Sequence, residues 1–162
     1  MNSSEDAARR LLRHTLATVA YRGAKAFRGA PASFSAFRIN ESSRTAAQLV
    51  AHMGDLYDWA LSMAQGKMAW HDSTPLEWSR EVARFFASLK KFDDYLASDN
   101  AVHAKLEGLF QGPVADSLTH IGQLAMMRRL AGCAITGENY FVAEMVAGRV
   151  GAEQAPPKME FT

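Results

Sequence analysis

The chain has 162 residues, of which 48% are hydrophobic and 22% charged, and its formal net charge is +1. This length suits one domain with a core of its own, and the composition excludes a disordered chain. The small net charge argues against a nucleic-acid-binding protein, and no apolar run approaches the ~20 residues of a membrane span. A single cysteine, Cys133, excludes a disulfide framework and a cysteine-rich zinc site. The polar start of the chain is unlike a secretory signal, so we expect a cytoplasmic protein.

Two helices are expected in the first part of the chain. Apolar residues recur at three- and four-residue steps over 5–28, which predicts the first helix. Thr45, followed by Gln48 three residues later, is typical of a capping box and predicts a second helix that stops at Gly66. The connection 29–43 is expected to be held on the body by three apolar side chains, Phe34, Phe37 and Ile39.

A third helix start is indicated just after the second helix. Thr74, Pro75 and Glu77 have the order of an N-cap, a first-turn proline and a capping-box acid. A heavy apolar face then continues to residue 97. We therefore expect the third helix over 74–97.

The second half of the chain is expected to contain one long and two short helices. Residues 99–112 form a linker with a short helix at 104–110. Pro113 is expected to open the fourth long helix, which ends at Gly132. A shorter fifth helix is predicted at 139–147, followed by an extended tail.

Taken together, these elements predict an all-α fold. Four long amphipathic helices imply a four-helix bundle, here with a short fifth C-terminal helix. We expect a single domain over 1–162, with its core formed by about 5–150 and an extended tail beyond.

Among the five histidines, His71 and His103 fall in expected loops and are interpreted as solvent-facing residues without partners. Asp116 and His120 are four residues apart, so they lie on one helical face one turn from each other. That is the spacing of two ligands of one metal ion, although such a pair is more often a surface polar pair. His52, beside an apolar stripe, is the best third ligand, and a satisfied core histidine is the alternative.

Three segments, RTAAQLVAHMGDLYDWA, DSLTHIGQLAMMRRLAG and GENYFVAEMVAGRVG, resemble in order and spacing the DinB superfamily, which includes damage-inducible DinB proteins and bacterial low-molecular-weight thiol S-transferases. The resemblance covers residues 5–150. Its most specific part is a lone histidine on the second helix, followed later by a His-x-x-x-His pair before Gly-Gln. His52 and His120 match the first and last of these positions, and Asp116 stands where the family usually has a histidine.

The resemblance implies an up-down-down-up bundle with a three-ligand divalent metal site between helices, and frequent homodimers. Two histidines and one carboxylate suit a divalent ion with open positions, which we expect to be Zn, Ni, Fe or Mn. A homodimer is also favoured by Phe85 and Phe86, which are not both expected to point at one core. The family further implies a bacterial protein with a role in stress response.

Several residues near these ligands are candidates for a binding pocket. Trp59 returns to the face of His52 after two turns, although core packing is the commoner role for an aromatic residue at this spacing. Arg128 follows the proposed metal-binding face and is suited to an anionic ligand, with a solvated or ion-paired arginine as the alternative. Cys133 is interpreted as an inert buried thiol. The candidate pocket residues are Gln123, Trp59, Tyr57, Met127 and Arg128.

The leading functional hypothesis is a metal-dependent enzyme that activates a thiol or water at His52, Asp116 and His120. It would be a thiol S-transferase, using a small thiol and an electrophilic substrate, or a hydrolase. The alternative is a non-catalytic ligand- or metal-binding protein associated with stress. A third hypothesis, a purely structural helical dimer, is favoured by the short fifth helix and predicts no pocket at His52.

Overall fold

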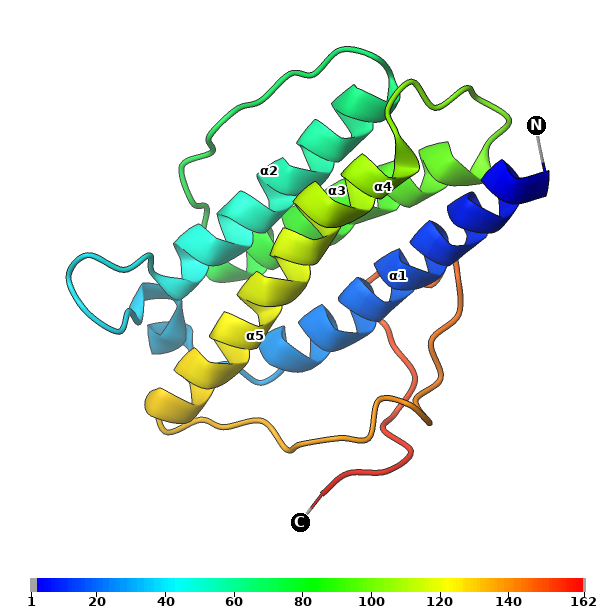
Figure 1. Ribbon diagram of the computed structural model, residues 1–162. Coiled ribbons are helices and arrows are strands. Elements are labelled where there is room, and N and C mark those ends of the chain that lie inside the picture. The colour runs from blue at the N-terminus through cyan, green and yellow to red at the C-terminus, as the bar shows by residue number, and fades with distance from the viewer. Residues whose placement is uncertain (1–2, 162) are drawn as a thin grey trace.

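The computed structural model describes residues 3–161, and within them the chain is all-helical. Four long helices lie side by side (Figure 1) and are α1 (Ser3–Phe27), α2 (Ala46–Ala64), α3 (Trp78–Ala97) and α5 (Ala115–Leu130). A short α4 (Leu106–Leu109) and a π-helical turn, η2 (Phe110–Val114), lead into α5, and a 3-10 turn, η1 (Ala32–Ala36), follows α1. No strand forms within 3–161, which confirms the all-α prediction. None of these helices combines the length and apolar character needed to cross a membrane.

The start of α2 is capped as the sequence predicts. The Gln48 N–H donates to Thr45 Oγ1 at 3.2 Å, and the Thr45 N–H donates to Gln48 Oε1 at 2.8 Å. After the helix, Gly66 takes a φ of 78°, a left-handed conformation that glycine adopts without strain. The capping box fixes where α2 begins and hence the direction in which His52 projects.

Residues 67–77, here called the strap, run back along the outside of α2 before α3 begins (Figure 1). Ser62 Oγ accepts from the Ala69 N–H at 2.9 Å near one end of the strap. Near the other end, the Ser73 N–H and hydroxyl both donate to the Asp55 carboxylate, at 2.8 and 2.7 Å. The strap therefore lies against α2 along most of its length.

The predicted start of α3 at Thr74 is wrong, because α3 begins four residues later, at Trp78. Glu77 is itself the N-cap, and its carboxylate accepts from the N–H groups of Ser79 and Arg80. The Leu76 N–H donates to the buried Glu81 carboxylate at 2.7 Å. Because the N–H groups of Leu76 and Ser73 are already bonded to side chains, the residues before Trp78 stay extended.

Pro113 does not open a helix, contrary to the prediction, but lies inside the π-helical turn between α4 and α5. A proline lacks an N–H and its ring clashes with the carbonyl four residues earlier, so a regular α-helix is disfavoured there. The Ala115 N–H instead donates to the Phe110 carbonyl five residues earlier, which is the π-type spacing. Helical structure consequently continues from Leu106 to Leu130 without a break.

The core between the four long helices is rich in aromatic side chains. The Phe27 ring meets Phe85 and Phe86 edge-on, with ring centroids 5.3 and 5.8 Å apart, and all three side chains are buried. Phe85 and Phe86 therefore point into one core, so the argument that they favour a homodimer is wrong. The homodimer itself stays a prediction from the resemblance.

Of the three side chains expected to hold the connection after α1 on the body, only one is fully buried. Phe34 is buried, and Phe37 is partly buried with its ring stacked on that of Phe34 at 6.2 Å. Ile39 is 57% exposed, so the expectation that it pins the connection is wrong.

The fifth helix predicted at 139–147 does not form, and the segment consists of turns and irregular structure. The Asn139 N–H donates to the Met159 carbonyl and the Phe161 N–H to the Gly137 carbonyl, both at 2.9 Å. The two parts of the C-terminal segment thus pair with each other. Phe141, within this segment, is 95% exposed.

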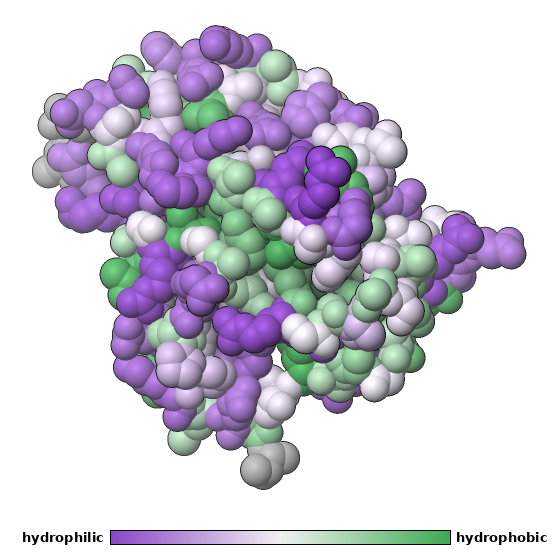
Figure 2. Space-filling model, turned by 180° about the vertical axis from the view of Figure 1, so that it is seen from behind, coloured by the Kyte–Doolittle hydropathy of each residue, from purple (hydrophilic) through white to green (hydrophobic). Residues whose placement is uncertain are grey.

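The face opposite that of Figure 1 carries a hollow whose floor is apolar and whose margin is polar (Figure 2). A cavity of about 600 Å³ lies where the end of α1, the start of α3 and residues 152–156 of the tail meet. This cavity contains neither of the histidines predicted as ligands.

Candidate metal centre

Three side chains from two helices meet between α2 and α5. His52 projects from α2, and Asp116 and His120 project from successive turns of α5. The Asp116 carboxylate lies between the imidazoles, with Oδ2 3.4 Å from His52 Nε2 and Oδ1 3.4 Å from His120 Nε2. The two ring centroids are 5.0 Å apart. The convergence of these side chains, predicted from the sequence, is confirmed.

Gln123 fixes the orientation and the tautomer of His120. Its amide oxygen Oε1 lies 2.7 Å from His120 Nδ1, and because that oxygen can only accept, Nδ1 carries the proton. In the neutral ring Nε2 then has a free lone pair, which faces the Asp116 carboxylate. A proton on Nε2 or a metal ion between the two groups would join them. A hydrogen bond from the far ring nitrogen is also how proteins orient histidine ligands of metals.

The spacing of the three groups fits a divalent ion. Each residue offers a ligand atom within 4.8 Å of the other two. Two ligand atoms ~2.1 Å from a tetrahedral ion lie ~3.4 Å apart. The carboxylate of Asp116 lies at this separation from each histidine. The group has three protein ligands within residues 3–161, and such a number leaves coordination positions open.

His52 is kept neutral by its surroundings. Its burial lowers its pKa from the ordinary 6.5, and the nearby positive charge of Arg44 lowers it further. The contact with Asp116 acts in the opposite direction but is outweighed. Since only a neutral imidazole can bind a metal, this environment favours ligation over protonation near neutral pH.

Two tryptophan rings form a row in space beside His52. Trp70, from the strap, meets the His52 ring edge-on at 5.7 Å, and Trp59 meets Trp70 edge-on at the same distance. Trp59 is therefore one ring removed from the ligand, whereas Trp70 contacts it. The prediction that Trp59 faces the site directly needs this correction, which arises because the strap inserts its own aromatic ring.

Two clefts border the ligand set. A cleft of about 310 Å³ is lined by Ile39, Ser43, Arg44, Leu49, His120, Gln123 and Met127. A smaller, more polar cleft of about 170 Å³ is lined by Arg44, Gln48, His52, Asp55, Asp72, Ser73 and Pro75. Gln123 and Met127 thus line a pocket as predicted. Arg44 lines both clefts and was not singled out from the sequence, because it lies just before the second helix and outside its periodic pattern.

Two predicted pocket residues lie elsewhere. Tyr57 is completely buried against Phe85 and Phe92, and burial strongly raises its pKa. It belongs to the core. Arg128 is 5% exposed and donates to four carbonyl groups, those of Ala26, Arg28, Gly29 and Cys133. It is neither a ligand-binding nor a solvated arginine, and it joins the end of α5 to the end of α1.

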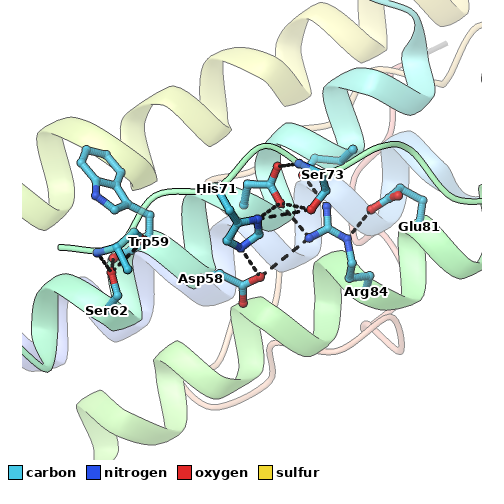
Figure 3. Close-up of polar contacts among 10 residues, drawn as sticks. Asp58, Trp59, Ser62, His71, Ser73, Glu81 and Arg84 are labelled. Carbon is cyan, nitrogen blue, oxygen red and sulfur yellow. Dashed lines mark hydrogen bonds and ion pairs between the residues drawn. The ribbon is translucent and has the colours of Figure 1, made fainter. Parts of the chain in front are cut away.

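A second acidic group lies one helical turn further along α2, where His71 of the strap contacts Asp55 and Asp58 (Figure 3). His71 and His103 are both exposed loop residues, as expected, but His71 has carboxylate partners, so the expectation that it has none is wrong. Arg84 of α3 already supplies the positive charge here, with Nη1 2.9 Å from Asp55 Oδ1 and Nε 2.6 Å from Glu81 Oε1. We interpret this group as a structural connection between α2, α3 and the strap.

No protein-family model matches the sequence, and no curated protein or solved structure matches it closely enough to identify a relative. The residues of the site therefore carry the functional argument.

Proposed function

We propose that the protein is a metal-dependent enzyme of the DinB type, in which His52, Asp116 and His120 hold one divalent ion, Zn, Ni, Fe or Mn. The observation that carries the proposal is the convergence of the three side chains, each of which offers a ligand atom within 4.8 Å of the other two. The contact between Gln123 and His120 Nδ1 supports it, because it turns Nε2 of the ring toward the Asp116 carboxylate.

The directions of the helices support the kinship with the DinB superfamily. The strap returns along α2, so α2 and α3 run the same way, whereas α1 and α5 run the other way (Figure 1). This is the order of an up-down-down-up bundle. The order of the ligands along the chain also agrees with the resemblance, with Asp116 as the departure.

His52, Asp116 and His120 would hold a divalent ion, and this ion would supply a lowered pKa for a bound thiol or water and so a nucleophile near neutral pH. The residues of the chain serve to bind and orient the reacting molecules at the site. Gln123 holds the His120 ring in place, Trp70 shields one side of His52, and the cleft of about 310 Å³ opens beside His120. This volume suits a small molecule. We therefore propose a thiol S-transferase or hydrolase acting on a small electrophile.

Metal binding is tested first. Protein purified without an affinity tag is analysed for metals, and Co²⁺, Ni²⁺ and Zn²⁺ are titrated by calorimetry. We expect one ion per chain, with affinity reduced at least ~100-fold in His120→Ala and ~10–100-fold in Gln123→Ala. His14→Ala, which changes an exposed histidine of α1, is the matched control. Binding unchanged in His120→Ala would refute the site.

Turnover is tested second, with the metal-loaded protein, a panel of low-molecular-weight thiols and an activated aryl chloride as electrophile. Thioether formation above the rate of the Asp116→Asn variant supports the transferase. Tight metal binding with no turnover of any thiol or ester substrate supports the alternative, a non-catalytic metal-binding protein.

A further inference from the structure

Arg44 lies beside the ligand set and borders both of its clefts. It directly precedes Thr45, the N-cap of α2, and its side chain is exposed. It lines both the cleft that contains His120 and the cleft that contains His52. Its positive charge also acts on His52. The Arg44 guanidinium group thus lies between the two clefts that lead to the proposed metal centre.

This guanidinium has no protein partner within residues 3–161, neither an ion pair nor a hydrogen bond. The contrast with the other arginines near α2 and α5 is clear. Arg84 is held by three carboxylates, and Arg128 by four carbonyl groups. These two serve the fold, whereas the five donors of Arg44 are available to a ligand.

The larger cleft indicates what kind of molecule Arg44 would bind. Ile39, Leu49 and Met127 give the cleft an apolar wall, and Ser43, Arg44, Gln123 and His120 give it polar groups. A matching ligand has an apolar body and one anionic group. The smaller cleft on the other side of Arg44 carries the carboxylates of Asp55 and Asp72, which disfavour a doubly charged phosphate. A single guanidinium pairs well with one carboxylate.

We propose that Arg44 is a substrate-binding residue that selects small carboxylate-bearing molecules, holding the carboxylate at the cleft while the reacting end reaches the ligand set. This inference rests on the proposed function, because the reacting end is placed at His52, Asp116 and His120. It adds a substrate class, since the ligand set alone would accept charged and neutral molecules alike.

The test compares two thiols that differ only in the carboxylate. The full chain is loaded with Co²⁺, and the charge-transfer absorption of the cobalt thiolate is titrated with mercaptopropionate and with mercaptopropanol. In the wild type we expect mercaptopropionate to bind about 5-fold tighter, a typical effect of one partly exposed ion pair. In Arg44→Gln this preference disappears, while the affinity for mercaptopropanol is unchanged. Arg10→Gln, at an exposed arginine of α1, is the control and keeps the preference.

Salt provides a second readout, because the preference should decrease from low to high ionic strength in the wild type. A preference that persists in Arg44→Gln overturns the inference, since the carboxylate would then be chelating cobalt instead of binding the guanidinium. Equal affinities for the two thiols in the wild type overturn the inference alone and leave the metal centre standing. Failure to bind cobalt overturns the proposed metal centre and this inference with it, and failure to bind either thiol overturns the thiol-dependent activity and this inference with it.

Discussion

Replacing Arg84 by methionine should release the strap and destabilise the whole bundle. The guanidinium group joins α3 to α2, because it donates to Glu81 Oε1 of its own helix at 2.6 Å and, on α2, to Asp55 Oδ1 at 2.9 Å and to the Ala51 carbonyl at 2.6 Å. Methionine keeps most of the apolar stem and removes only the charge and the donors. The change therefore isolates the polar connection.

The size of the effect follows from the burial of the partners. The side chains of Glu81 and Asp55 are 0% and 3% exposed, so the substitution leaves two buried carboxylates without a cation. Breaking a buried ion pair on one side costs ~3–5 kcal/mol. Arg84 is itself 21% exposed, and Asp55 and Glu81 keep the hydrogen bonds from Ser73 and Leu76. We therefore expect the lower end, about 3 kcal/mol, or a melting temperature lower by about 6–12 °C.

Urea denaturation followed by circular dichroism measures the loss, and trypsin cleavage after Lys67 reports release of the strap. Arg80→Met, at an exposed arginine on the same helix, should stay within about 0.5 kcal/mol of the wild type. If Arg84→Met behaves like this control, the interpretation of the group as a structural connection is refuted.

The same connection can be disturbed from α2. A Cβ at Gly54 would lie 2.9 Å from the Arg84 guanidinium carbon. Alanine ordinarily stabilises a helix relative to glycine by ~1 kcal/mol. Because Arg84 is held in place by Asp55 and Glu81, we expect Gly54→Ala to destabilise the protein instead. A gain in the urea midpoint would show that the guanidinium moves away at little cost.

Three further perturbations address other parts of the molecule. Arg128→Met should lower the free energy of unfolding by about 3 kcal/mol in urea, because four carbonyl groups lose a charged donor, whereas the exposed neighbour Arg129→Met should have little effect; similar losses in both would contradict the assigned role. Glu138→Gln should cost about 2 kcal/mol and speed hydrogen exchange in the tail, since the buried Glu138 carboxylate binds Tyr21 and Lys25; unchanged exchange would show that the tail is held elsewhere. Burial lowers the pKa of His52 from 6.5 in the metal-free folded protein, so on acidification the unfolded chain takes up this proton first, and the free energy of unfolding should fall between pH 6.5 and the lowered pKa. In urea titrations the His52→Gln variant should lose less free energy of unfolding over that range. Equal losses in the variant and the wild type would refute the direction of the pKa shift.

The sequence predicts the parts of the fold that depend on local chemistry. The capping box of Thr45 and Gln48 lies within one helical turn, and it forms as expected. The equally local signal at Thr74 fails, because Asp55 of α2 and Glu81 of α3 bond to the backbone around it. Nothing in a stretch of sequence reveals that a buried carboxylate from another element will compete for its N–H groups.

The candidate site divides in the same way. Asp116 and His120 share a helical face by spacing alone, and the place of His52 beside an apolar stripe, together with the resemblance to a family, indicates it as their partner. Arg44 and His71 belong to irregular segments, where no periodicity indicates direction. Their positions depend on how the connections fold over α2, and only the three-dimensional structure places them beside the site.

The π-helical turn before α5 makes the candidate site dependent on one surplus residue. A π turn is an α-helical turn with one additional residue, and each residue of a helix advances it by ~100°. Leu109, before the turn, is buried in the core, and Asp116, after it, faces His52. A chain that lacks Pro113 could close into a plain α-helix, and it could then bury Leu109 or present Asp116, but not both. A single-codon deletion would thus dismantle the ligand set while leaving every ligand in the sequence.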